Sequence, residues 1–150
     1  MRIKSLKVSG FKSFCHLVEM GFTEHGTTVV VGPNGCGKSN VVDAIRWVLG
    51  EQRPKHLRGG SMEDVIFAGS AFQKPRGMTE VTLTFANPTG DTLSRFNEYS
   101  EIAVTRRLYR SGESVYMINK TPVRLMDIRE LFMDTGIGGT GDSIVEQGRV

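Results

Sequence analysis

The residues best suited to chemistry lie in one short run, from Gly32 to Ser39. Its order, Gly-Pro-Asn-Gly-Cys-Gly-Lys-Ser, fits the pattern G-x-x-x-x-G-K-[ST]. In such a loop the glycines let backbone N–H groups curl around a polyphosphate, and the lysine adds a charge toward the β- and γ-phosphates. The serine hydroxyl is a ligand for Mg²⁺. The run therefore predicts a nucleotide site, the alternative being a glycine-rich turn that carries a lysine by chance.

The elements on either side of this run favour the nucleotide site. Thr27 to Val31 is a short β-branched run of the kind that forms a buried strand. Apolar residues then recur at helical spacing from about Lys38 to Leu49, and Gly50 is a suitable stop. A helix that begins at Lys38 places the positive end of its dipole at the phosphates. Motif and context together still leave kinases, GTPases and ABC-type ATPases open.

The remaining pattern predicts an α/β protein. A helix is expected over Arg124 to Phe132, and Met62 to Phe67 is expected to be a short strand or a turn. Alternation of apolar and polar residues predicts strands over Ile3–Val8, Leu17–Phe22, Glu80–Phe85, Ile102–Tyr109 and Val115–Ile118. The fold class we expect is a mixed sheet that carries the phosphate loop and its helix, with an additional antiparallel β lobe from the region 79–120.

Composition sets broad limits on the function. The chain has 150 residues, of which 39% are hydrophobic, and a net charge of +3, which permits contact with nucleic acid without requiring it. Its two cysteines, Cys15 and Cys36, lack the spacing of a metal site and are expected to stay reduced. The sequence contains no apolar run near the roughly 20 residues of a membrane span, so we expect a cytoplasmic protein.

Several segments, in order from the first residue to the last, resemble the SMC family of ABC-type ATPases. Besides the phosphate loop, they are the segments 10–14 (GFKSF), 43–52 (DAIRWVLGEQ), 57–60 (LRGG), 62–70 (MEDVIFAGS), 106–114 (RRLYRSGES) and 146–148 (EQG). One shared loop would be a weak sign, whereas this many ordered segments indicate membership. The resemblance implies that residues 1–150 form the N-terminal half of an SMC ATPase head. The coiled coil, hinge and C-terminal half-head are expected in further sequence, because the chain contains no heptads, no Asp-Glu strand end and no Ser-Gly-Gly signature.

The resemblance also implies roles for individual residues. Gln147 matches the family residue that helps to hold Mg²⁺ and the attacking water, and Arg58 lies in the family's arginine loop near the γ-phosphate. Lys12 and Ser13 match positions that approach the phosphates, and Asp64 lies near where the family holds the adenine. ATP contacts are expected along the whole loop, at Gly32, Pro33, Asn34, Gly35, Cys36, Gly37, Lys38, Ser39 and Asn40, with Ser39 and Gln147 as the metal ligands.

Each of these roles has a plainer alternative. Gln147 could be a solvated loop glutamine, Arg58 a surface arginine in a basic loop, and Ser13 a bystander beside two phenylalanine anchors. Trp47 is expected to pack against a neighbouring element rather than to stack on a base. The arginines of the 106–114 segment could touch DNA, but we expect strand arginines of this kind to be solvated: Arg106, Arg107 and Arg110.

The function that the resemblance implies is ATP hydrolysis coupled to DNA organisation. ATP would lie between two heads, with a second SMC subunit, the C-terminal half-head, a kleisin-type subunit and DNA as partners at the nucleoid. The chain alone is not expected to hydrolyse ATP, because the catalytic glutamate belongs to the other half. The alternatives are a self-contained P-loop kinase or GTPase, for which we find no second acidic motif, and a non-catalytic module that binds a nucleotide.

Overall fold

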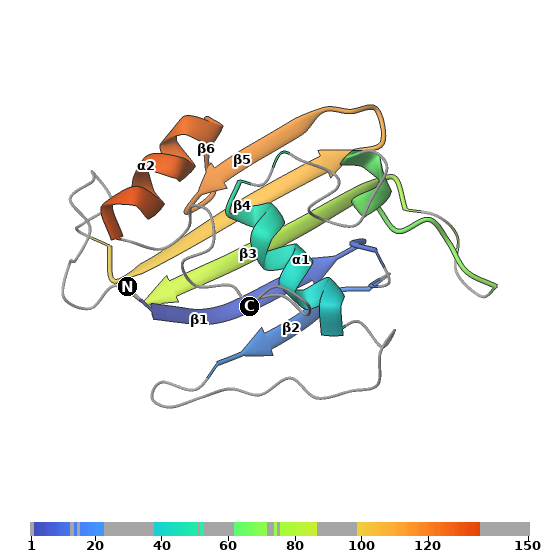
Figure 1. Ribbon diagram of the computed structural model, residues 1–150, viewed down its shortest axis with the longest axis horizontal. Coiled ribbons are helices and arrows are strands. Elements are labelled where there is room, and N and C mark those ends of the chain that lie inside the picture. The colour runs from blue at the N-terminus through green and yellow to red at the C-terminus, as the bar shows by residue number, and fades with distance from the viewer. Residues whose placement is uncertain are drawn as a thin grey trace, which may run out of the picture.

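One antiparallel sheet organises the chain. The computed structural model describes residues 2–12, 14, 16–22, 38–50, 52, 62–71, 74, 76–86 and 99–135. Six strands are paired in the order β2-β1-β3-β4-β5-β6 (Figure 1). They are β1 (Arg2–Ser9), β2 (Val18–Gly21), β3 (Met78–Ala86), β4 (Glu101–Tyr109), β5 (Ser114–Ile118) and β6 (Thr121–Val123). All neighbouring pairs among these strands are antiparallel, and the strand expected at 27–31 lies outside the described residues.

The strands form where apolar and polar residues alternate. In β3, Val81, Leu83 and Phe85 are fully buried, while the threonines between them lie on the other face and are half-buried. This is the pattern of a sheet with one face against a core. The strands predicted at 3–8, 17–22, 80–85, 102–109 and 115–118 are all confirmed, and those of the 79–120 region share a single sheet with β1 and β2.

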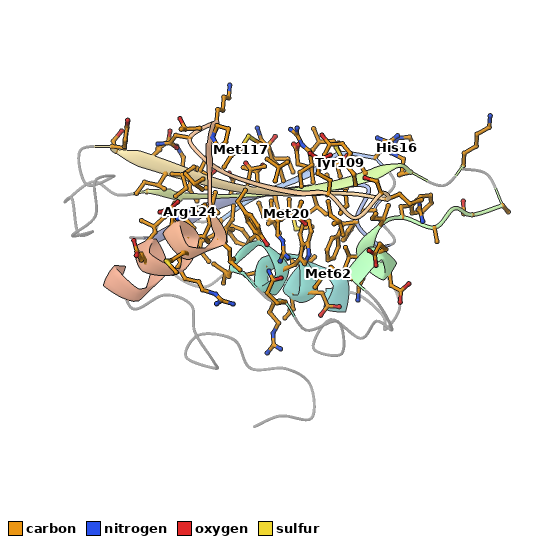
Figure 2. The ribbon with its side chains drawn as sticks, turned by 90° about the horizontal axis from the view of Figure 1, so that it is seen from above. His16, Met20, Met62, Tyr109, Met117 and Arg124 are labelled. Carbon is orange, nitrogen blue, oxygen red and sulfur yellow. The ribbon has the colours of Figure 1, made fainter. Side chains whose placement is uncertain are left out.

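The helices cover one face of this sheet. They are α1 (Lys38–Val48) and α2 (Leu125–Thr135), with the short 3-10 helix η2 (Met62–Val65) beside them. Figure 2 shows the sheet from its edge, with the helices on one side and Met117 and Tyr109 on the other. Both predicted α-helices are confirmed, and the region predicted as a strand or turn is the single turn η2. Within the described ranges, no helix is long and apolar enough to cross a membrane.

The core lies between the helices and the sheet. Trp47 from α1 is fully buried, and its ring lies 5.6 Å from that of Phe11, which follows β1. Phe132 from α2 packs on Phe85 from β3 at a centroid distance of 5.3 Å. Tilted aromatic pairs at these separations add to the stabilisation that burial alone provides. The expectation that Trp47 is a packing residue is therefore confirmed.

Candidate nucleotide site

Three segments far apart in the sequence meet at the end of β1. Gly10 turns the chain with φ +65°, and a Cβ atom there would lie 2.5 Å from the carbonyl oxygen of Met78, so only glycine fits without a shift. The Gly10 carbonyl accepts a hydrogen bond from the N–H of Phe67 (2.7 Å), and the Lys12 N–H donates one to Val65 (2.6 Å). The loop after β1 is thus fastened to η2 and to the residues that follow it.

The α1 helix supplies the anion-binding end of this region. It begins at Lys38, runs for 11 residues and has no acidic residue in its first turn. The positive end of its dipole is therefore not offset by a carboxylate of its own, which favours a negatively charged ligand. For Lys38, Ser39 and Asn40 only the helical backbone is described. The preceding loop residues, Gly32 to Gly37, lie outside the described residues.

Lys12 and Asp43 form an ion pair between the β1 loop and α1. The Lys12 Nζ lies 2.6 Å from Asp43 Oδ2, and the two side chains are 13% and 2% exposed. The sequence alone assigned Asp43 no partner. A possible signal was its position, since an acidic residue stands between the buried Val41 and Ala44 on the packed side of the helix. A carboxylate buried there requires a cation or several donors.

The other predicted site residues divide into two groups. Asp64 lies in η2 and is exposed, next to the Val65 carbonyl that accepts the Lys12 N–H, so the structure brings these two segments together. Ser13, Arg58 and Gln147 lie outside the described residues. Among the described residues, no group of three or more His, Cys, Asp or Glu side chains could hold a metal ion.

The buried guanidinium of Arg106 lies at the C-terminal end of α1. Arg106, from β4, lies between the rings of Trp47 and Tyr116, with its guanidinium carbon 4.6 Å and 5.0 Å from their centroids. Its Nη1 donates a 2.7 Å hydrogen bond to the Trp47 carbonyl in the last turn of the helix, where a cation is favourable. Arg106 is 1% exposed, so the prediction that it is solvated is wrong. Its place in the β4 alternation turns it toward the helix-covered face.

The other two arginines of this segment lie elsewhere. Arg107 faces the opposite side of β4 and pairs with Glu80 at 2.6 Å, half-buried. The Tyr109 hydroxyl and the Glu80 carboxylate raise the pKa of Arg107, so it stays charged. Arg110 is exposed and donates hydrogen bonds to the carbonyl oxygen of Arg76. The prediction of solvation is therefore confirmed for Arg110 alone.

Arg106 and Arg107 provide a matched test of burial. We expect Arg106→Ala to lower the free energy of unfolding by about 3 kcal/mol, because it removes two ring contacts and a charged hydrogen bond and leaves a cavity. Arg107→Ala breaks a partly exposed pair and should cost about 1 kcal/mol or less. Urea unfolding of the chain measures both. Equal costs would contradict the role of Arg106 in holding α1 on the sheet.

Comparison with known proteins identifies the family. The model of the RecF/RecN/SMC N-terminal domain family matches residues 2–140. A solved structure from work on ATP-driven dimerization and DNA-stimulated activation of SMC ATPases superposes with a TM-score of 0.90 at 34% identity, covering 99% of this chain and 88% of that one. The chain belongs to the SMC family. Its fold is accordingly that of an SMC ATPase head, as the resemblance predicted.

Further SMC proteins match this chain over only part of their own length. The chromosome partition protein Smc of Myxococcus xanthus is 58% identical over 151 residues, which cover all of this chain and 12% of that protein. A Smc head domain with an extended coiled coil, bound to the C-terminal domain of ScpA from Pyrococcus furiosus, superposes with a TM-score of 0.85 at 34% identity. That match covers 91% of this chain and 34% of the solved one. This SMC chain thus spans about an eighth of the curated relative.

Proposed function

We propose that residues 1–150 are the ATP-binding half of an SMC head. Together with a C-terminal half-head and a second SMC subunit, the head hydrolyses ATP to drive DNA organisation, chromosome condensation and segregation. The observation that carries this proposal is the superposition of nearly the whole chain on an SMC ATPase at a TM-score of 0.90. The start of α1 at the lysine of the phosphate-loop motif supports it, because a helix N-terminus at that point favours phosphate.

The nucleotide would be held by the loop and the first turn of α1. Backbone N–H groups within residues 32–40, other than Pro33, and the Lys38 ammonium would bind the phosphates, and Ser39 with Gln147 would hold Mg²⁺. Lys12 and Ser13 would add contacts to the phosphates, and Asp64 would lie near the adenine. The described residues fit an anion, since the helix end has no acidic residue in its first turn. When bound, Mg²⁺ would neutralise charge that develops on the phosphates during transfer to water.

Partners follow from the proteins that this chain resembles. The solved SMC ATPase is described as dimerizing under the drive of ATP and being activated by DNA, and the P. furiosus Smc head carries the C-terminal domain of ScpA. We infer the same classes of partner here: a second SMC subunit, DNA and a kleisin-type subunit. A protein with these partners acts in the cytoplasm, at the nucleoid.

The carboxylate of α1 disfavours a self-contained kinase or GTPase. Such an enzyme needs an acidic group of its own beside the metal. Asp43 is the acidic residue within α1, and its carboxylate is buried against the Lys12 ammonium. Moving it to a metal would leave that ammonium without this counter-charge, so Asp43 is poorly suited to be a metal ligand.

Arg58 provides a test of the catalytic assignment. The test protein is Smc of M. xanthus in which the matching segment is replaced by this chain, and we refer to it as the hybrid Smc. The unaltered hybrid should hydrolyse ATP and respond to DNA. Arg58→Ala should leave ATP affinity within about twofold and lower turnover tenfold or more, most of all in the presence of DNA, because a guanidinium near the γ-phosphate offsets developing charge.

A second arginine in the same basic stretch is the control. Arg53→Ala removes an equal charge five residues earlier and should change turnover little. Steady-state phosphate release with and without DNA gives both comparisons. Equal turnover for Arg58→Ala and the unaltered hybrid would contradict a catalytic role for Arg58.

A further inference from the structure

The ion pair between Lys12 and Asp43 joins two elements at the proposed nucleotide site. It crosses from the loop after β1 to the buried side of α1, over a separation of 31 residues in the chain. Asp43 is almost completely enclosed, and Lys12 keeps only a small exposed fraction. A buried carboxylate is unfavourable unless a cation compensates it, so this pair constrains both side chains.

The backbone of Lys12 is fixed as firmly as its side chain. Lys12 itself adopts a left-handed conformation, with φ 49°, directly after the Gly10 turn. Its N–H is bonded to Val65, and the preceding Phe11 is fully buried against Trp47 of α1. Because lysine rarely adopts this left-handed conformation, the surrounding contacts hold it there. The stem of Lys12 therefore starts from a defined point beside the helix.

The pair lies close to the anion-binding end of the helix. Asp43 is five residues after Lys38, a rise of about 7.5 Å along the axis. Helical side chains lean toward the N-terminus, so the carboxylate and the ammonium bonded to it lie nearer to that end than the Asp43 backbone does. A lysine ammonium has three donors on a flexible four-carbon stem. A hydrogen bond from the Lys12 ammonium to Asp43 is therefore compatible with a second one from the same ammonium to a phosphate group.

We propose that Asp43 is a positioning residue that holds the Lys12 ammonium in place as a bridge between α1 and the nucleotide phosphates. This inference rests on the proposed function. The alternative is that phosphate pulls Lys12 away from Asp43. Removing one partner of a buried pair costs on the order of a thousandfold in an equilibrium constant. A hydrogen bond to a charged group returns roughly ten- to a hundredfold, so bridging is favoured over exchange.

Two single variants and their combination test this in the hybrid Smc. Lys12→Met should lower ATP affinity about tenfold or more and lower Tm, because Asp43 loses its counter-charge. Asp43→Asn keeps the shape of the side chain and one acceptor, and it should lower ATP affinity several-fold because the ammonium is held less firmly. The double variant removes both charges, so its Tm should return close to that of the unaltered hybrid. Its ATP affinity should stay as low as that of Lys12→Met.

The double variant separates positioning from simple stabilisation. If the pair only stabilises the fold, the double variant regains both Tm and ATP affinity, and the proposal is overturned. Isothermal calorimetry with ATP and thermal unfolding give the two readouts, and the double variant is informative even if Lys12→Met does not fold. Lys38→Ala distinguishes failure of the proposed function from failure of this inference. If it leaves ATP bound, the proposed function fails; if it abolishes binding while Lys12→Met does not weaken it, only this inference fails.

Discussion

Lys38→Ala is expected to abolish ATP binding. Lys38 is the lysine of the phosphate-loop motif and the first residue of α1, so its ammonium and the positive end of the helix dipole act on the same anion. Hydrogen bonds to charged groups contribute about 1.5–3 kcal/mol each, and a lysine directed at two phosphates makes more than one. We therefore expect a loss of affinity on the order of a hundredfold or more.

A lysine on β1 provides the control. Lys7 lies on β1 and is exposed, five residues before Lys12, and its neighbours in the strand, Leu6 and Val8, are buried on the helix-covered face. Lys7→Ala changes the net charge equally and should leave ATP affinity unaltered. Titration of the hybrid Smc with a fluorescent ATP analogue measures both variants. Unchanged affinity in Lys38→Ala would refute the assignment of the phosphate loop.

The isolated chain is expected to have no steady-state ATPase activity. Hydrolysis at a phosphate-loop site needs an acidic group near the metal and a group that positions water. Asp43 is engaged with Lys12 on the packed side of α1. Glu146 neighbours Gln147 in sequence and lies outside the described residues. We infer that both missing groups come from a C-terminal half-head or from a second subunit.

Most of the fold could be predicted from local pattern. Strands such as β3 alternate strictly, and α1 repeats apolar residues at helical spacing, so each could be assigned from its own residues. The short strand β6 was not predicted, because it has only three residues and Pro122 at its centre. A proline lacks the N–H that a strand donates, which places it at the edge of the sheet.

The contacts that define the site depended on tertiary structure. The phosphate-loop motif is local and could be recognised directly, whereas the Lys12–Asp43 pair joins residues that only the fold brings together. The burial of Arg106 also depends on the tertiary structure. A run of two strand arginines does not reveal which of them faces the core, and the structure buries Arg106 while its neighbour pairs with Glu80 on the other face. Long-range register, set by the whole sheet, decides such cases.

The most direct test of the account is a mixing experiment. Purified chain would be assayed for phosphate release alone, and then with a separately purified C-terminal half-head of M. xanthus Smc, each with ATP and Mg²⁺. A parallel series with the Lys38→Ala chain measures contaminating ATPases. We predict release at the Lys38→Ala level for the chain alone and release well above it for the mixture. Turnover by the unaltered chain alone above that control would contradict the account and indicate a self-contained enzyme.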